Sequence, residues 1–230
     1  MKYGVALRVQ EVRERIAAAC RRAGRDPASV QLVAVTKTVP ADAVLEAIDA
    51  GVCHVGENRV QEAREKFPLL PEGVTRHLVG HLQTNKSRHA VRLFDWVHSL
   101  DSLRLAEALG KRAVEEGRRL RCLVQVNVSR EVTKHGVDPD QLLPLLERVG
   151  RVPGLEIRGL MAMGPLTEDE AAVRRAFAEA RRLFEAAGRE GFPGVVMEHL
   201  SMGMSGDFEI AVEEGATMVR VGSAIFGPRR

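Results

Sequence analysis

Apolar residues in this chain follow a helical spacing in some segments and a strand-like spacing in others. From residue 5 to 23, Val5, Val9, Val12 and Ile16 recur at helical intervals, and Gly24 follows as a stop signal. After this segment come short runs rich in β-branched residues, each of which predicts a buried strand. These runs cover residues 30–36, 52–55, 76–79, 96–99, 122–128, 156–163, 195–200 and 217–221.

Helical patterns separate the predicted strands, and several of them carry start and stop signals. Residues 103–116 form one such pattern, which Gly117 ends. The run Thr-Glu-Asp-Glu at 167–170 resembles a capping box. The helix that it begins is expected to reach residue 187 and to end at Gly188.

Strands that alternate with helices predict right-handed βαβ units and a parallel sheet. Eight such units in 230 residues fit an α/β fold of the closed (β/α)8 TIM-barrel type, with segment 5–23 as an extra N-terminal helix. An open doubly wound sheet is the alternative, but the glycine-rich turn expected after its first strand is absent. No linker divides the chain, so residues 1–230 are expected to form one domain.

Composition argues against a nucleic-acid-binding or membrane-spanning protein. The net charge is +3 and only 4% of residues are aromatic, so a stacking surface for nucleic acid is not expected. Three scattered cysteines, no apolar run long enough to span a membrane and no signal-peptide core predict a cytoplasmic protein. Cys53 and Cys122 adjoin strand-like segments and are expected to be buried.

Lys37 follows the first predicted strand, in Val33-Ala34-Val35-Thr36-Lys37-Thr38. Burying a lysine is costly unless it is paired, deprotonated or used covalently. A desolvated lysine at a strand end is a candidate Schiff-base former, because its amine is free to attack an aldehyde. The alternative is that the strand stops at Thr36 and that Lys37 points into water.

Two late segments have the composition of an anion site. Residues 200–207 and 221–227 are rich in glycine and serine, and they follow the last two predicted strands. TIM barrels often bind phosphate there, through backbone amides, and the hydroxyls of Ser201 and Ser223 can add hydrogen bonds. Together with Lys37, these segments predict a phosphate-bearing aldehyde, and pyridoxal 5′-phosphate (PLP) is the obvious candidate.

Arg220 shares a strand face with Met218 and Gly222, so it should point into the barrel beside the phosphate loop. An arginine near a pyridine nitrogen cannot accept a proton and leaves the ring unprotonated, which weakens the ring as an electron sink. The alternative for Arg220 is a buried ion pair with a neighbouring carboxylate.

Other polar residues also lie near the ends of predicted strands. Gln125 and Asn127 share one face of the fifth predicted strand, which we expect to look into the barrel, although Asn127 could equally cap a loop. The histidines show no metal-ligand spacing: His77 and His81 span a strand and its loop, with no carboxylate at matching distance in the sequence. We therefore expect no metal site.

Several motifs resemble the pyridoxal phosphate homeostasis proteins (the YggS/PROSC family), and the similarity runs over essentially the whole chain. The motifs are residues 33–38, Gly56-Glu57-Asn58, residues 77–86, Gly159-Leu160-Met161-Ala162-Met163, residues 200–205 and residues 219–227.

The resemblance implies a single barrel like the N-terminal domain of alanine racemase. It implies that PLP is held as an internal aldimine on Lys37, with Arg220 near the pyridine nitrogen and with Ser201, Gly222 and Ser223 around the phosphate. Asn58 is expected to line the pocket. The implied function is buffering PLP and delivering it, with no significant turnover, to recipients that could include apo PLP-dependent enzymes.

Two enzyme functions are the alternatives. A PLP-dependent amino-acid racemase needs a second base, which in similar racemases is a tyrosine from another domain. Here the sequence stops at Arg230, and its one tyrosine, Tyr3, precedes the first helix. A Schiff-base aldolase would need Lys37 alone. We expect a monomer, and we consider Lys134 either a residue for cofactor transfer, near a second PLP site, or an ordinary loop lysine.

Overall fold

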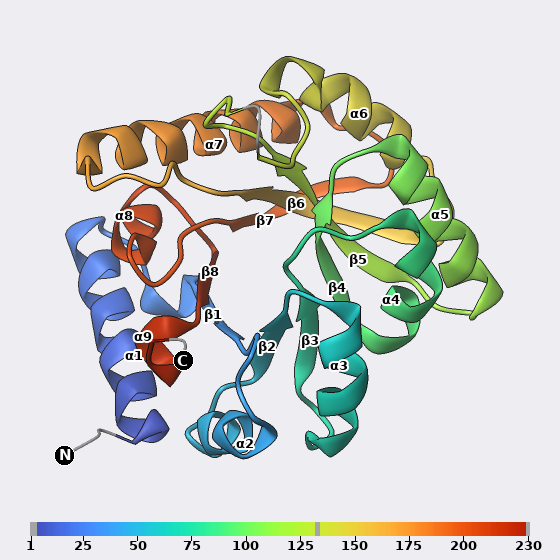
Figure 1. The fold of residues 1–230 in the computed structure, drawn as a ribbon. Helices are drawn as coiled ribbons and strands as arrows, with labels where there is room; N and C mark the ends of the chain where they lie inside the picture. The colour runs from blue at the N-terminus through green and yellow to red at the C-terminus, as the bar shows by residue number, and fades with distance from the viewer. Residues whose placement is uncertain (1–3, 132–133, 229–230) are drawn as a thin grey trace.

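The computed structural model describes residues 4–131 and 134–228. Eight parallel strands close into a barrel in the order of the sequence, as the alternation of segments predicts (Figure 1). In register, Val33 of the first strand lies beside His54 of the second and Arg220 of the eighth. The strands are β1 Gln31–Val35, β2 His54–Glu57, β3 Thr75–Leu78, β4 Trp96–Leu100, β5 Leu120–Val126, β6 Leu155–Ala162, β7 Val195–Ser201 and β8 Met218–Val221.

The predicted strands match these elements to within one residue at each end, except for β2 and β5, which are each displaced by two residues. The strand β2 begins two residues later than the sequence pattern indicates and includes Glu57. The strand β5 ends at Val126, so Asn127 lies outside it. Cys122 is buried as expected, but the prediction for Cys53 is wrong, since this residue is exposed just before β2.

Helices surround the barrel (Figure 1). They are α1 Val5–Arg22, α2 Ala41–Asp49, α3 Val60–Lys66, α4 Ser87–Leu93, α5 Leu103–Glu115, α6 Leu142–Val149, α7 Glu170–Glu190, α8 Phe208–Glu213 and α9 Ser223–Phe226. The expected end of α7 at Gly188 is wrong: the helix continues to Glu190 and ends at Gly191, which adopts the left-handed conformation (φ 64°). None of the helices in the described part of the chain is both long enough and apolar enough to cross a membrane.

The N-terminal cap of α7 also differs from the capping box that the sequence suggests. Asp169, not Thr167, is the cap residue, and its carboxylate accepts hydrogen bonds from the amides of Ala171 and Ala172. The Thr167 hydroxyl instead accepts a hydrogen bond from the Asp169 amide. Both groups satisfy backbone donors at the helix start, and the cap residue lies two positions later than predicted.

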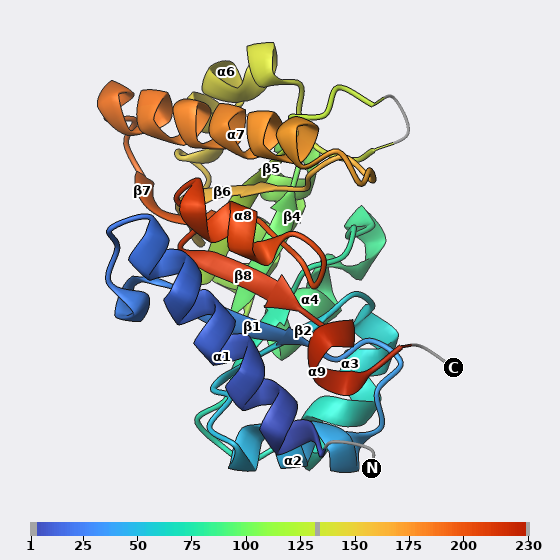
Figure 2. The same ribbon diagram turned by 90° about the vertical axis from the view of Figure 1, so that its left-hand side faces the viewer.

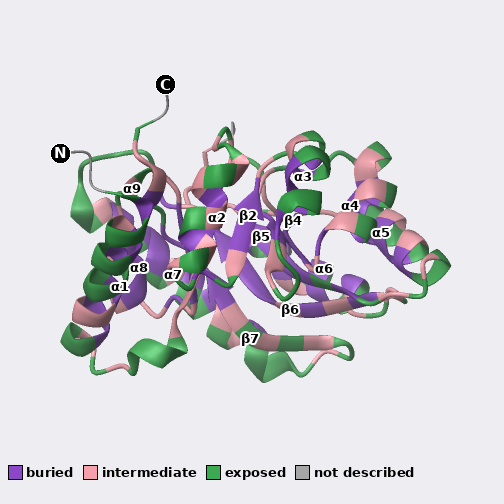
Figure 3. Cartoon of the chain, turned by 90° about the horizontal axis from the view of Figure 1, so that it is seen from below, coloured by how far each residue is buried: buried purple, intermediate pink, exposed green. Residues whose placement is uncertain are grey.

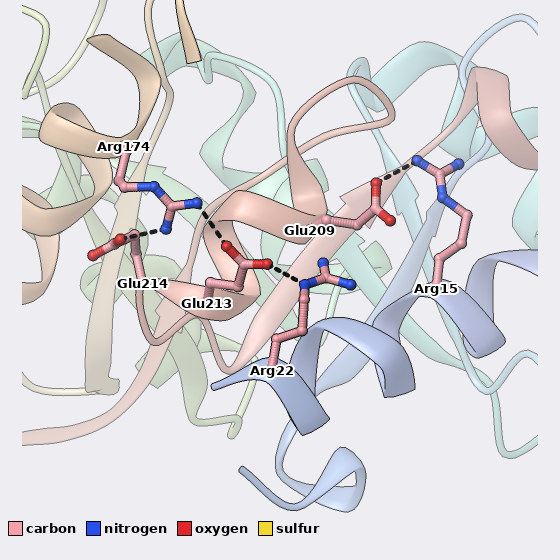
Figure 4. Close-up of polar contacts among 6 residues, drawn as sticks. All are labelled: Arg15, Arg22, Arg174, Glu209, Glu213 and Glu214. Atoms are coloured by element: carbon pink, nitrogen blue, oxygen red, sulfur yellow. Dashed lines mark hydrogen bonds and ion pairs between the residues drawn. The ribbon is translucent and has the colours of Figure 1, made fainter. Parts of the chain in front are cut away.

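The extra helix α1 packs along α8 and α9, beside β8 (Figure 2). Its buried face carries the apolar residues that the periodicity predicts, among them Val9, Val12 and Ile16. At the rim of this contact, ion pairs connect α1 to α8 and α8 to α7 (Figure 4). They join Arg15 to Glu209, Arg22 to Glu213, and Arg174 to Glu213 and Glu214. Exposed pairs contribute at most about 1 kcal/mol each, so the apolar face carries most of the docking.

Apolar residues form two cores. The larger core lies between the barrel and the helices, while a small cluster of Trp96, Leu123, Met161 and Met218 lies inside the barrel. Figure 3 shows the buried strands at the centre and exposed residues on the outer helix faces. The barrel interior also holds buried polar side chains, which bear on the candidate site.

Candidate functional site

Lys37 lies at the carboxyl end of the barrel, two residues beyond the end of β1. It is half-buried, and the next residue, Thr38, has a positive φ of 60°. The Thr38 amide donates a 2.9 Å hydrogen bond to Glu62 of α3, which holds this unusual turn in place. The backbone of the turn that carries Lys37 is thus fixed from the helix layer.

A buried ion pair lies directly behind this turn. The Glu57 carboxylate accepts hydrogen bonds from the Thr36 hydroxyl at 2.6 Å and from the Lys66 ammonium at 2.5 Å. Lys66 also donates to the backbone carbonyl of Thr36 at 2.7 Å. Glu57 is fully buried, so the pair ties the ends of β1 and β2 to α3 in a dry environment. This pair was not predicted from the sequence, in which a lysine nine residues after a strand-end glutamate is its only signal.

Lys37, Gly222 and Ser223 line one pocket of about 420 Å³. Parallel strands end at the same side of the barrel, so the residues after β1 and β8 meet there. Parts of α1, the start of α2 and the segment after α9 complete the walls. The structure therefore brings together the lysine and part of the glycine-serine loop that the sequence predicts.

A serine that the sequence analysis did not single out meets this loop. The Ser205 hydroxyl accepts hydrogen bonds from the backbone amides of Gly222 and Ala224, both at 3.2 Å. The carboxylate of Asp207 accepts a hydrogen bond from the Met204 amide and shapes the same turn. The two amides donate to Ser205, whose hydroxyl keeps its own hydrogen as a donor, and hydroxyls and backbone amides of this kind are the groups that phosphate sites use.

Ser201 is placed differently from Ser205. It is fully buried inside the barrel, and its hydroxyl accepts a 2.7 Å hydrogen bond from Arg220. Its other neighbour is His98, whose Nδ1 lies 3.1 Å away. The hydroxyl of Ser201 is therefore engaged with the interior of the barrel, whereas Ser205 contacts the amides of the loop.

Arg220 points into the barrel, as its position beside Met218 predicts. It is 4% exposed, and its second hydrogen bond goes to the backbone carbonyl of Ala162 at 3.0 Å. Burial lowers the pKa of Arg220 to about 10, with Asp207 acting in the opposite direction, so the guanidinium stays charged at neutral pH. These two hydrogen bonds go to a hydroxyl and a carbonyl rather than to the carboxylate that a buried ion pair would require.

Asn58 follows β2 and lines a separate depression of about 580 Å³ with His81 and Lys86. Its backbone is tightly packed, because a side chain on Gly80 would place its Cβ 2.3 Å from the Asn58 carbonyl oxygen. The structure thus does not place Asn58 in the pocket that Lys37 lines.

The polar face of the fifth predicted strand serves local structure. Gln125 is buried and donates to the carbonyl of His135, and Asn127 donates to the carbonyl of Glu131. Asn127 is therefore a loop cap, one of the two roles left open for it. The Lys134 ammonium binds the Glu131 carboxylate at 2.6 Å and the Gly164 carbonyl at 3.0 Å. Tyr3, which the racemase alternative would need, lies outside the described residues.

Three potential metal ligands come together from different loops. Ligand atoms of His81, Asp101 and His135 all lie within 4.8 Å of one another. The two rings are stacked with an interplanar angle of 8°, so the nitrogen lone pairs lie in nearly parallel planes and do not converge. This grouping could not be read from sequence spacing, and the expectation of no metal site stays a prediction.

Comparison with known proteins places this architecture in a family. Residues 7–230 match the model of the alanine racemase N-terminal domain. The pyridoxal phosphate homeostasis protein of Aquifex aeolicus is 41% identical over 224 residues, which is 97% of this chain and 97% of that protein. The one of Escherichia coli is 43% identical over 231 residues, or 98% and 97% of the two chains.

Solved structures agree with this placement. PipY of Synechococcus elongatus, solved with PLP bound, is 43% identical with a TM-score of 0.81, and the match covers 94% of this chain and 100% of that one. An alanine racemase of Clostridium difficile has a TM-score of 0.73 at 12% identity, covering 96% of this chain and 56% of that one, which shows a shared fold alone. The chain belongs to the pyridoxal phosphate homeostasis protein family, on the alanine racemase N-terminal domain fold.

Proposed function

We propose that this chain is a single-domain PLP-binding protein that buffers and delivers the cofactor, with no significant turnover of its own. One observation carries the proposal: Lys37, Gly222 and Ser223 line one pocket. In the loop that contributes Gly222 and Ser223, two backbone amides donate hydrogen bonds to the Ser205 hydroxyl. The relative solved with PLP bound, at 43% identity, supports the same conclusion.

The donor set fits the cofactor. PLP supplies an aldehyde that bonds covalently to a primary amine, a phosphate and an aromatic ring nitrogen. Lys37 offers the amine, Gly222 and Ser223 in the loop that follows β8 offer backbone amides and a hydroxyl, and Ser205 in the loop that follows β7 offers a second hydroxyl to the phosphate. The pocket of about 420 Å³ lies within the range of roughly 300–1,000 Å³ common for small-molecule sites.

Ser201 and Arg220 belong to the ring end of the proposed site. Arg220 only donates hydrogen bonds, so it leaves a ring nitrogen facing it unprotonated and favours binding over carbanion chemistry. Ser201 acts there through its hydrogen bond to Arg220. Asn58 stays a prediction for the outer rim of the site, since it lines the neighbouring depression.

We also propose which proteins receive the cofactor, the oligomeric state and the cellular compartment. Apo forms of PLP-dependent enzymes are the recipients that a delivery role requires, and we propose that the chain acts as a monomer. The cysteines Cys20, Cys53 and Cys122 are all free thiols, which suits the reducing cytoplasm.

Absorbance spectroscopy followed by borohydride reduction and peptide mapping tests the proposal. The holo-protein should be coloured, and the pyridoxyl mass should appear on the peptide that contains Lys37. Lys37→Ala should be colourless, whereas the matched variant Lys134→Ala should keep its colour. A pyridoxyl mass on Lys134 or Lys86 in place of Lys37 would contradict the assignment.

A further inference from the structure

Five buried or half-buried side chains form one continuous hydrogen-bonded chain across the barrel interior. His54 Nδ1 lies 3.0 Å from His77 Nε2, and His77 Nδ1 lies 2.9 Å from His98 Nε2. His98 Nδ1 lies 3.1 Å from the Ser201 hydroxyl, which accepts the 2.7 Å hydrogen bond from Arg220. The chain thus links β2, β3, β4, β7 and β8.

Arg220 sets the direction of every hydrogen bond in this chain. A guanidinium has no acceptor, so Ser201 must accept from Arg220 and is left with its own hydrogen to donate. A buried hydroxyl hydrogen without an acceptor is costly, and His98 Nδ1, 3.1 Å away, is an acceptor within reach, so we assign the ring proton of His98 to Nε2. His98 therefore donates to His77 Nδ1, and His77 in turn donates from Nε2 to His54 Nδ1. The obligatory donor Arg220, together with a Ser201 hydrogen directed at His98, thus assigns the Nε2–H tautomer to three neutral rings.

The surroundings keep the rings neutral. His77 and His98 are fully buried, and His77 is stacked against Trp96 with ring centroids 5.9 Å apart. Burial lowers the pKa of both rings well below the ordinary value, and the charges that add to this effect are cationic. The permanent cations among them are Arg121 for His77 and Arg220 for His98.

We propose that His98, His77 and His54 are positioning residues for Arg220, because their directional chain holds the Ser201 hydroxyl in the orientation that accepts from the guanidinium. Arg220 cannot receive a proton, so the chain does not conduct protons to the pocket. These hydrogen bonds instead fix the position of the Arg220 side chain from the opposite side of the barrel. Only the consequence for cofactor binding rests on the proposed function.

One end of this series of hydrogen-bonded side chains, His54, is not fully enclosed by the protein. His54 is half-buried and lines a hollow of about 540 Å³ with Cys53, among the residues before β1 and β2. His54 and Arg220 are far apart in the sequence, so no local sequence pattern indicates that hydrogen bonds connect them. The hydrogen-bonded chain therefore extends from His54, at the amino-terminal end of β2, to Arg220, just before the proposed phosphate-binding loop.

Nitrogen-15 NMR of the histidine side chains in the PLP-free protein tests the chain directly. His54, His77 and His98 should each be neutral at pH 7 with the proton on Nε2. A proton on Nδ1 of His98, or a charged ring at any of the three positions, would overturn the proposal. This readout does not depend on PLP binding, so it remains informative if the proposed function fails.

Two replacements of His98 separate positioning from packing. His98→Asn keeps an acceptor for Ser201, whereas His98→Leu removes it at similar bulk. In His98→Leu we expect faster hydrogen exchange of the Arg220 guanidinium and about ten-fold weaker binding of both PLP and pyridoxal, comparable to the loss of one charge-assisted hydrogen bond. His98→Asn should stay close to wild type in both measurements.

His199→Asn is the control, because this ring contacts Trp96 but lies outside the chain. It should leave the exchange of Arg220 unchanged. Equal behaviour of the three variants in exchange and in binding would mean that His98 is only a packing residue. If His98→Leu does not fold, the wild-type tautomers and His98→Asn still decide the question.

Discussion

The Ser205 hydroxyl accepts a 3.2 Å hydrogen bond from the backbone amide of Gly222, across the loops that follow β7 and β8. Ser201, four residues earlier, has its hydroxyl inside the barrel against Arg220. The two serines of one Ser-Met-Gly-Met-Ser segment thus face different ends of the candidate site.

Replacing each serine by alanine should separate these roles. Ser205→Ala should weaken PLP binding by roughly ten-fold while barely affecting pyridoxal, because a phosphate hydrogen bond contributes about 1.5–3 kcal/mol. Ser201→Ala should weaken both ligands alike, since it acts on Arg220. Fluorescence titrations with the two ligands measure this. If Ser201→Ala alone discriminates between them, Ser201 is the phosphate ligand, as the sequence suggests.

The ion pair between Glu57 and Lys66 should be a strong determinant of stability. Glu57→Gln should lower the free energy of unfolding by about 3–5 kcal/mol, because it leaves a buried ammonium without its counter-charge. Glu115→Gln, which breaks the exposed pair with Arg112, is the control and should cost no more than about 1 kcal/mol. Urea denaturation compares the two, and equal effects would show that burial of the first pair is irrelevant.

Stability should fall on mild acidification because of the buried histidines. Burial lowers the pKa values of His54, His77, His98 and His199 in the folded protein. On acidification through the ordinary histidine pKa of about 6.5, the unfolded chain therefore binds protons before the folded chain does.

Below this pKa, each of these histidines can lower the free energy of unfolding by up to about 1.4 kcal/mol for each pH unit. Above this range the rings are neutral in both states, so this contribution to stability is fully present. Urea midpoints between pH 7.5 and roughly 5.5 check the prediction, in a window above the usual titration of carboxylates. A flat profile in this window would contradict neutral buried rings.

Gly159 should not tolerate a side chain. Its φ is +140°, and a Cβ there would lie 1.8 Å from the backbone oxygen of His199 on the neighbouring strand. Gly159→Ala should cost about 2–5 kcal/mol from backbone strain and overpacking. Gly24→Ala is the matched control: its φ is +64°, but nothing lies within 4 Å, so about 1–2 kcal/mol is expected. Thermal melts that rank the two in reverse order would refute this reasoning.

The holo-protein should not exchange the α-hydrogen of amino acids at a useful rate. In the proposed site, Arg220 would leave the ring nitrogen facing it unprotonated, and this would weaken the stabilisation of a carbanion. Incubation with L-amino acids in heavy water, followed by chiral chromatography and mass spectrometry, measures exchange and racemisation. Sustained exchange near ~1 s⁻¹, the low end of ordinary enzyme turnover, would mean that the protein is an enzyme.

Much of the architecture was predictable from the sequence alone. The alternation of strand-like and helix-like patterns determines a closed parallel barrel, and such a barrel gathers its strand ends on one side. This is why Lys37 and Gly222, 185 positions apart in the printed sequence, could be expected to line one pocket. The parity of β8 likewise predicted that Arg220 points inward, because successive side chains alternate between the two faces of a strand.

Only the tertiary structure decided which side chains become partners. Strand parity places His98 and Ser201 inside the barrel, but the hydrogen bond between them joins residues 103 positions apart and depends on the registers of the two intervening strands, β5 and β6. The same holds for the pairing of Glu57 with Lys66 and for the choice of Ser205 over Ser201 at the Gly222 amide. Periodicity in a sequence records the face on which a residue lies, whereas a hydrogen bond requires distances near 3 Å that only the packed barrel sets.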